Sequence, residues 1–204
     1  MDNFSRNKIF YKVRQTVLEL LEDRKYNLPE EEKTLPFNEF SERLEEQQIN
    51  LEGRHKDDEN KLCYVNFFLE SKTFGKKDLV NVREFINENY AKNDINVIII
   101  LQEKPTAQIN KELTLEEYKN FEFFLAKQLM INITKHVRVP KHEIVSKEEL
   151  EKVLEKFQAN INQLPKILST DPVAKYYGMK PGDVCKIKRN SPMTGETYYY
   201  RLVR

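Results

Sequence analysis

A run of five apolar residues, Val97–Leu101 within INVIIILQ, constrains the fold more than any other feature. A strand with one face in water alternates apolar and polar residues, whereas a short continuous apolar run is typical of a strand buried on both faces. The run therefore predicts a strand inside a sheet that is covered on each side. It is far shorter than the roughly 20 apolar residues of a membrane-spanning helix, so we expect no membrane association.

The segments around this run alternate in type. LCYVNFFL (Leu62–Leu69) is rich in aromatic and β-branched residues and predicts a strand. KKDLVNVREFINENY has its apolar residues on one stripe and predicts an amphipathic helix. Downstream, LTLEEYKNFEFFLAKQLM predicts a helix that opens with a capping box of Thr114 and Glu117, and INITKHVRV predicts a strand. The alternation predicts an α/β domain over residues 1–135.

The chain begins with a predicted helix from Ser5 to Lys25, whose apolar residues recur at helical spacing. A second helix is expected over residues 38–48, and EGRHKDDENK is expected to be a polar loop. The first helix also has a basic face, which is either an ordinary solvated face or a contact for nucleic acid: Arg6, Lys8, Lys12 and Arg14.

The pattern restarts at Pro140, so we place a domain boundary near residues 134–140 and assign residues 136–204 to a second, small α+β domain. Ser146 and Glu149 form a capping box that opens a helix over Lys147–Phe157. The first half of DPVAKYYGMKPGDVCKIKR then specifies a very short helix. Asp171 suits its N-cap, Pro172 suits its first position, and Gly178 suits the left-handed residue that ends it.

The second half of this segment predicts a hairpin. KPGD places Gly182 where a type II turn needs a positive φ. VCKIKR and YYYRLV are then paired strands, with Cys185 and Ile187 on one face and Lys186 and Lys188 on the other. We expect an aromatic face and a basic face, and we expect at least one tyrosine of Tyr198–Tyr200 to be buried in the core and not to serve as a platform for stacked bases.

The residues do not assemble into a catalytic, cofactor or metal site. Phosphate-binding loops with G-x-x-x-x-G-K-[ST] or G-x-G-x-x-G are absent, and the chain has only 5 glycines. Histidines 55, 136 and 142 lack metalloprotease spacing, although a metal pair of His136 and His142 is conceivable. Cys63 and Cys185 are far apart and are expected to be free thiols.

The net charge of +1 is unevenly distributed. Residues 1–135 carry 21 basic and 25 acidic residues, a net charge of −4, and residues 136–204 carry 13 and 8, a net charge of +5. A domain that binds duplex DNA by itself usually has a stronger basic excess. Any contact with nucleic acid is therefore expected to be local or assisted by a partner.

The motifs INITKHVRVPKH, HEIVSKEELEKVLEKF and QLPKILSTDPVAKYYGMKPGDVCKIKRNSPMTGETYYYRLV resemble the assembly domain of one family. This is the small H/five-type subunit of archaeal and eukaryotic multisubunit DNA-directed RNA polymerases. Three N-terminal segments, VRQTVLELLEDRKY, INVIIILQ and FEFFLAKQLMINIT, resemble more weakly the jaw domain of the eukaryotic form, which archaeal forms lack. The resemblance implies a non-catalytic subunit with a jaw domain and an assembly domain.

The resemblance also implies partners and sites. The assembly domain is expected to dock on the largest polymerase subunit, and the jaw to lie near downstream duplex DNA. The residues expected at the protein interface are His142, Asp171, Pro172, Tyr176, Gly178, Lys186, Lys188, Arg189 and Arg201. Those expected near DNA, in the loop after the central strand, are Lys104, Pro105, Thr106 and Ala107.

Some positions depart from the family pattern, namely Pro192, Met193 and Glu196 near the hairpin tip. With the Asn-, Lys- and Ile-rich composition, this divergence fits a copy encoded by a large DNA virus. The chain is then expected inside the host cytoplasm and in virions, and otherwise in the nucleus. A free-standing nucleic-acid-binding transcription regulator is the alternative function.

Overall fold

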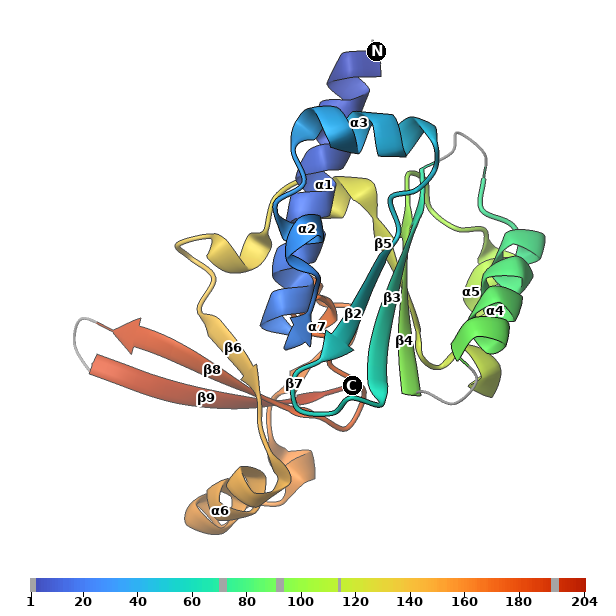
Figure 1. The fold of residues 1–204 in the computed structure, drawn as a ribbon. Coiled ribbons are helices and arrows are strands. Elements are labelled where there is room, and N and C mark those ends of the chain that lie inside the picture. Colours follow the sequence, from blue (N-terminus) through green and yellow to red (C-terminus); the bar gives the residue numbers. More distant parts are fainter. Residues whose placement is uncertain (1–2, 70–72, 91–93, 114, 192–194) are drawn as a thin grey trace. The chain divides into compact units, whose positions relative to one another are not determined.

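The computed structural model describes residues 3–69, 73–90, 94–113, 115–191 and 195–204 (Figure 1). Contacts between Cα atoms divide the chain into two compact units, Met1–Ile131 and Asn132–Arg204. The boundary expected between residues 135 and 136 falls just inside the second unit, at the end of the 3-10 turn η3 (Ile133–Lys135). Each unit has its own sheet.

The N-terminal unit is built on a five-stranded sheet in the order β1-β2-β3-β4-β5. The strands β1, β2 and β3 pair antiparallel, whereas β3, β4 and β5 run parallel. Their bounds are β1 Tyr26–Asn27, β2 Leu51–His55, β3 Lys61–Phe68, β4 Asp94–Leu101 and β5 Phe121–Leu125.

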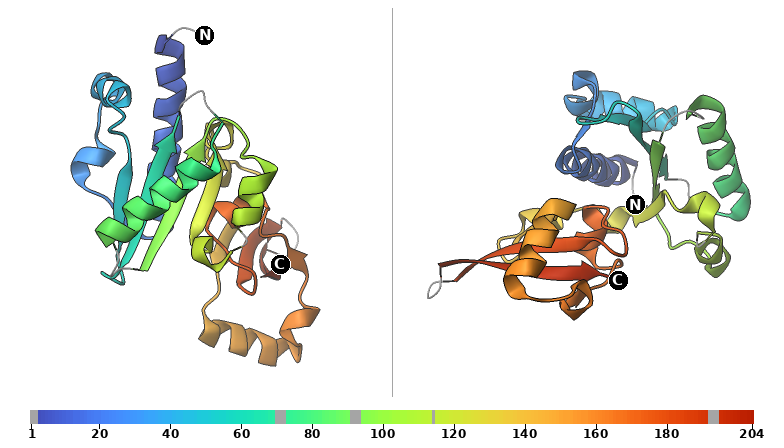
Figure 2. Two further views of the ribbon diagram at one scale, coloured as in Figure 1. Left: turned by 90° about the vertical axis from the view of Figure 1, so that its right-hand side faces the viewer. Right: turned by 90° about the horizontal axis from the view of Figure 1, so that it is seen from below.

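Helices cover both faces of this sheet, as the apolar run in β4 predicts (Figures 1 and 2). One side carries α1 (Asn3–Asp23), α2 (Glu30–Lys33) and α3 (Phe37–Glu45), and the other carries α4 (Lys76–Tyr90) and α5 (Ala107–Glu112).

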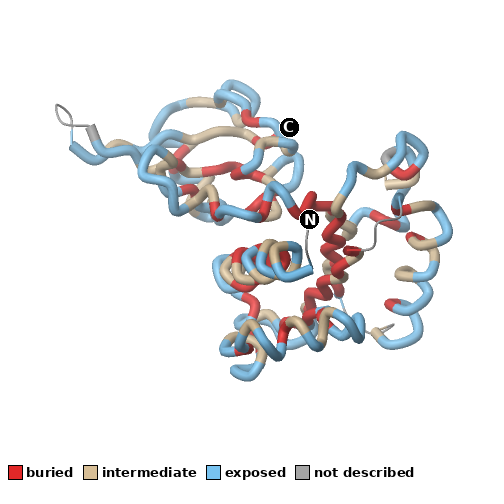
Figure 3. The backbone as a smooth tube through the Cα atoms, turned by 90° about the horizontal axis from the view of Figure 1, so that it is seen from above, coloured by how far each residue is buried: buried red, intermediate tan, exposed pale blue. Residues whose placement is uncertain are grey.

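The side chains of β4 fill both interfaces. Val97, Ile99 and Leu101 share a core with buried residues of α4 and α5. Since successive side chains of a strand point to opposite faces, the buried Ile98 and Ile100 lie on the other side. Figure 3 shows the buried parts of the described backbone in red. The predicted elements at α1, α3, α4, β3 and β4 are confirmed.

The predicted helix over residues 113–130 is wrong. This segment forms the 3-10 turn η1 (Glu116–Tyr118), the strand β5 and the 3-10 turn η2 (Ala126–Gln128). The sequence FEFFL extends because it can pair in parallel with β4 and bury Phe123 and Phe124. Burial against an existing sheet therefore outweighs the local helical pattern. The expected N-cap, Thr114, lies outside the described residues.

Two further expectations are corrected. The expected strand over Ile131–Val139 is instead the turn η3, which begins where the Asn132 side chain accepts a hydrogen bond from the Thr134 N–H at 2.9 Å. Ile131 is 75% exposed and Val137 fully exposed, so these β-branched residues pack against no sheet. In the expected loop EGRHKDDENK, the first residues belong to β2, whose buried Gly53 lies close to Tyr26.

The C-terminal unit is an α+β fold with a four-stranded sheet in the order β6-β8-β9-β7. Its strands are β6 Lys141–Ile144, β7 Lys166–Ile167, β8 Val184–Ser191 and β9 Gly195–Val203. The other elements are α6 (Lys147–Phe157), the 3-10 turn η4 (Ile161–Gln163) and α7 (Pro172–Tyr176). Ser146 caps α6 by accepting a hydrogen bond from the Glu149 N–H at 3.2 Å, as predicted.

Candidate functional site

The short helix α7 is capped at both ends by residues of its own segment. The Asp171 carboxylate accepts hydrogen bonds from the N–H groups of Val173 at 2.9 Å and Ala174 at 3.4 Å. At the other end Gly178 has a φ of 65°, the left-handed conformation that was predicted. The Met179 N–H then reaches the Ala174 carbonyl at 3.0 Å and the Gly178 N–H reaches Lys175, which is a Schellman motif.

A tight turn joins α7 to the sheet. The Asp183 N–H donates to the Lys180 carbonyl at 3.0 Å, and the Asp183 carboxylate accepts from the Lys180 N–H at 2.7 Å. Gly182 has a φ of 99°, and its N–H donates to the Val203 carbonyl at 3.0 Å. The helix, the turn and the last strand are therefore held as one piece, which gives the unit a preformed surface.

The core beneath α7 is small and apolar. Ala174 and Met179 pack with Cys185 and Ile187 of β8 and with neighbouring residues of β7 and β9. Burial raises the pKa of the Cys185 thiol to about 11 and that of the Cys63 thiol to about 12. Both thiols therefore stay protonated near neutral pH and pack as small apolar groups.

Several residues expected at the interface support its shape from within. His142 is buried on β6, and its Nδ1 lies 2.6 Å from the Pro140 carbonyl oxygen. Tyr176 is buried, and its hydroxyl accepts a hydrogen bond from the Asn132 amide at 3.0 Å. Asp171 caps α7 through its carboxylate, and Pro172 and Gly178 fix the backbone at the two ends of the helix.

The cations of the hairpin lie beside aromatic rings, so the expected separation into a basic face and an aromatic face is wrong. Lys186 lies 4.8 Å from the ring centre of Tyr198, and Arg189 lies 5.1 Å from that of Tyr199. The Arg201 guanidinium donates to the Lys166 carbonyl at 3.4 Å. Lys186 pairs with Tyr200 and Arg189 pairs with Thr197, so each of these cations contacts the tyrosine diagonal to it on the same face.

Two of these cations also pair with carboxylates. Lys186 reaches Glu149 of α6 at 2.7 Å, and Lys188 reaches Glu196 of β9 at 2.7 Å. Hydrogen bonds to these carboxylates raise the pKa of Lys186 and of Lys188. The positive charge of both side chains is therefore largely compensated within the unit.

The expectation that core packing buries one of the three consecutive tyrosines is also wrong. Tyr198 is 44% exposed and Tyr199 is 49% exposed, while Tyr200 is half-buried against Phe157. The neighbouring strand β7 pairs with β9 only at Leu202 and Val203, so Tyr198 and Tyr199 lie beyond it. An alternating strand buries residues only where another layer covers it.

In the N-terminal unit, the residues expected near DNA follow the carboxyl end of β4. Lys104, Thr106 and Ala107 are exposed and Pro105 is half-buried. The Thr106 hydroxyl caps α5 by accepting from the Ile109 N–H at 3.5 Å. The loop is therefore anchored on one side by a helix cap and on the other by the sheet.

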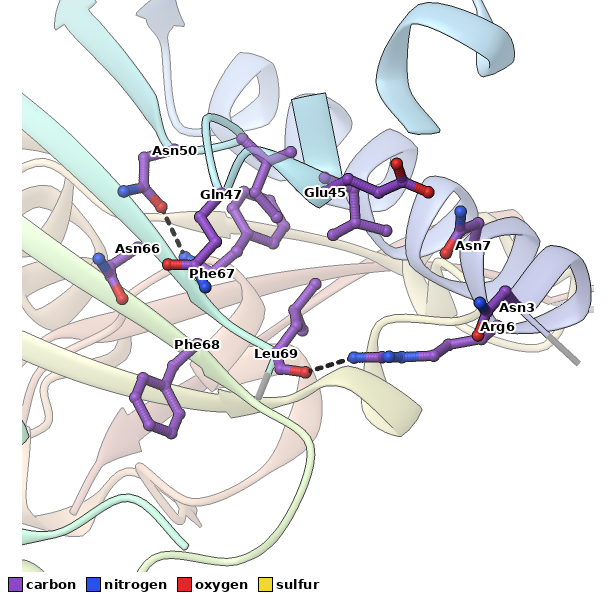
Figure 4. Close-up of a pocket in the computed structure, with 12 residues that line it drawn as sticks. Asn3, Arg6, Asn7, Glu45, Gln47, Asn50, Asn66, Phe67, Phe68 and Leu69 are labelled. Carbon is purple, nitrogen blue, oxygen red and sulfur yellow. Dashed lines mark hydrogen bonds between the residues drawn. The ribbon is translucent and has the colours of Figure 1, made fainter. Parts of the chain in front are cut away.

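A cavity of about 380 Å³ lies at the carboxyl ends of the parallel strands β3 and β4 (Figure 4). The sequence did not predict it. It lies between the start of α1 and the end of β3, where the Arg6 guanidinium donates to the Leu69 carbonyl at 3.0 Å. Gln102, just after β4, also donates to this carbonyl. The cavity arises from contacts between distant segments, and no local pattern reveals it.

The basic face expected on the first helix is smaller than predicted. Arg14 is buried, and its guanidinium pairs with Glu32 at 2.5 Å. Burial lowers the pKa of Arg14, and the charge of Glu32 opposes that effect. Lys8 and Lys12 are exposed.

The described residues contain neither a metal-binding cluster nor a membrane-spanning helix. Within these ranges, groups of three or more His, Cys, Asp or Glu side chains that could hold a metal ion do not occur. None of the helices described is long and apolar enough to cross a membrane.

Comparison with known proteins agrees with the resemblance seen in the motifs. The family described as RNA polymerase Rpb5, C-terminal domain matches residues 131–203, and that described as RNA polymerase Rpb5, N-terminal domain matches residues 5–88.

Individual relatives cover either the whole chain or one part of it. The DNA-directed RNA polymerases I, II, and III subunit rpabc1 of Dictyostelium discoideum is 33% identical over 193 residues, which cover 93% of this chain and 94% of the relative. The corresponding subunit RPABC1 of Caenorhabditis elegans is 31% identical, over 95% and 94% of the two chains. The DNA-directed RNA polymerase subunit Rpo5 of Thermococcus kodakarensis is 51% identical over 79 residues, 39% of this chain and 96% of the archaeal protein.

The left-handed residue at the end of α7 yields a stability prediction. We expect Gly178→Ala to lower the free energy of unfolding of the C-terminal unit by roughly 1 kcal/mol or more, because a Cβ is disfavoured at this φ. Gly75→Ala is the control, since its added Cβ would meet only Asp78 at an ordinary 3.6 Å. Urea unfolding, followed through the NMR signals of each unit in the whole chain, measures both. Equal destabilisation by the two variants would contradict the assignment.

Proposed function

The chain belongs to the Rpb5 family of RNA polymerase subunits, and from this membership we propose that it is a structural, non-catalytic subunit of a DNA-directed RNA polymerase. We propose further that its C-terminal unit docks on the largest subunit. The observation that carries this division of roles is the archaeal relative, a polymerase subunit whose length is almost fully matched by 79 residues of this chain. We infer that this match lies on the C-terminal unit, so that the N-terminal unit is dispensable for assembly.

The geometry of the C-terminal unit supports docking. The caps of α7, the turn at Gly182 and the pairing of β8 with β9 fix the backbone before any partner binds. A preformed surface loses little conformational entropy on binding, which favours stable association. The interface residues predicted from the motifs either shape this surface from below, as Tyr176 does, or extend from it, as Arg189 does.

Two fragments test which unit carries assembly. We expect residues 132–204 to co-purify with the largest subunit of the polymerase, because they contain the whole α7–hairpin unit. Residues 1–131 should not co-purify, since the N-terminal unit is proposed to act only after assembly. Co-expression of each fragment with the largest subunit, followed by affinity purification, measures both. Recovery of the subunit with residues 1–131 alone would overturn the proposal.

For the N-terminal unit we propose a position near the downstream duplex DNA. The candidate surface is the edge formed by the carboxyl end of β4, where the loop Lys104–Ala107 is exposed. Its single lysine can contribute only a local contact with phosphate. The N-terminal unit would therefore add to DNA held mainly by the rest of the polymerase.

Charge reversal at Lys104 tests this position. We expect Lys104→Glu to leave assembly intact, to shorten the lifetime of open complexes and to reduce the salt-dependence slope of DNA binding by about 1, the effect of losing one phosphate contact. Lys56→Glu is the matched control, because Lys56 is also exposed but follows β2 at the opposite end of the sheet. Identical behaviour of the two variants would count against a DNA contact at Lys104.

The alternative is a free-standing transcription regulator that binds nucleic acid by itself. The net charge of +1 and the compensated lysines of the hairpin favour the subunit role over this alternative. Tight binding of the isolated chain to duplex DNA at physiological salt would reverse that preference.

We propose that the chain is located with its polymerase inside the cell. If a large DNA virus encodes it, that place is the host cytoplasm and the virion, and otherwise it is the nucleus.

A further inference from the structure

The outer half of the β8–β9 hairpin, Lys188–Asn190 with Glu196–Tyr199, contains no buried residue, and only Lys188 and Thr197 are half-buried. The strand β6 pairs with β8 only as far as Lys188, and β7 pairs with β9 only at Leu202 and Val203, so the hairpin continues past both flanking strands (Figures 1 and 2). An isolated two-stranded ribbon is marginally stable in water without a further layer. This ribbon nevertheless carries two large aromatic side chains, Tyr198 and Tyr199, each more than two-fifths exposed.

The two tyrosines point to opposite faces of the ribbon because they are consecutive in one strand. The cations beside them confirm this arrangement, since Lys186 lies over Tyr198 while Arg189, three residues along β8, lies over Tyr199. One face therefore presents Tyr198 beside Lys186 and Lys188, and the other presents Tyr199 beside Arg189.

The charges on the hairpin favour a protein over a nucleic acid as its partner. On the Tyr198 face, Lys186 and Lys188 are both paired with carboxylates of this chain, so little charge is left to attract phosphates. On the Tyr199 face, Arg189 has no carboxylate partner among the described residues. Tyrosine and arginine are enriched in the centres of protein interfaces, where the rings supply apolar area.

We propose that this outer half of the hairpin is inserted between two surfaces of the largest polymerase subunit, so that protein covers both of its faces. The surface against Tyr198 is neutral and apolar, because the lysines there are already compensated. The surface against Tyr199 carries a carboxylate that pairs with Arg189. This inference rests on the proposed function and specifies the chemistry of the partner on each side.

Three substitutions test the two-sided contact in the assembled polymerase. We expect Tyr198→Ser and Tyr199→Ser each to weaken retention of the chain by the largest subunit at least about tenfold, as removal of a central aromatic side chain does. Arg189→Gln should weaken it to a similar extent, and only for this variant should the remaining binding lose much of its salt dependence. Tyr198→Phe and Tyr199→Phe keep the rings and should bind like the wild type.

Circular dichroism and hydrogen exchange at Cys185 and Ile187 check that each variant keeps the core of the unit folded. Loss of binding with only one of the two serine variants would replace the two-sided contact with a one-sided one and overturn the proposal. Normal binding by both serine variants would overturn the proposal as well. In that case, retention of the wild-type chain by the largest subunit would still support the proposed function. If both serine variants assemble normally but lose binding to a single-stranded oligonucleotide, the hairpin contacts nucleic acid and the proposal is wrong.

Discussion

The pairing of β8 with β9 is the interaction on which the C-terminal unit depends. Eight register pairs, from Val184 with Leu202 to Ser191 with Gly195, hold the two strands together. The strand β6 adds to the free edge of β8, and β7 adds to the free edge of β9. The turn before β8 is bonded to the end of β9 through Gly182 and Val203. The four-stranded sheet therefore supports α6 and α7, and the outer half of the β8–β9 hairpin continues from it.

The two units are stabilised in different ways. The N-terminal unit buries an apolar strand, β4, under helices on both sides and has a large core of its own. The C-terminal unit has a much smaller core, and its order comes from caps, turns and strand pairing. A small domain of this kind has little apolar area to bury by itself. Tyr198 and Tyr199 stay outside that core, and the proposed docking would cover them.

The sequence predicted the elements in which local and long-range preferences agree. The apolar run of INVIIIL predicts a buried strand, and Asp171, Pro172 and Gly178 specify a short helix through local capping chemistry. The segment FEFFL was misassigned because its pattern also fits a helix, and only pairing with β4 decides between the two. No local signal identifies Arg14 as buried, since its carboxylate partner, Glu32, lies on another helix.

Local residue types likewise predicted only part of the candidate site. The positions that shape α7 follow from their residue types, whereas the exposure of Tyr198 and Tyr199 depends on how far β7 and the other elements of the unit extend along the hairpin. The cavity beside Arg6 likewise depends on segments that meet only in the folded chain. Capping and turn chemistry are local properties, and surface exposure is a property of the whole unit.

Hydrogen exchange of the whole chain, free and within its polymerase, tests most directly the claim that the C-terminal unit is the docking unit. We predict that assembly slows exchange mainly at backbone amides of α7 and of the outer half of the β8–β9 hairpin, with little change in β4. Protection confined to the N-terminal unit, with the hairpin exchanging as in the free chain, would contradict the account.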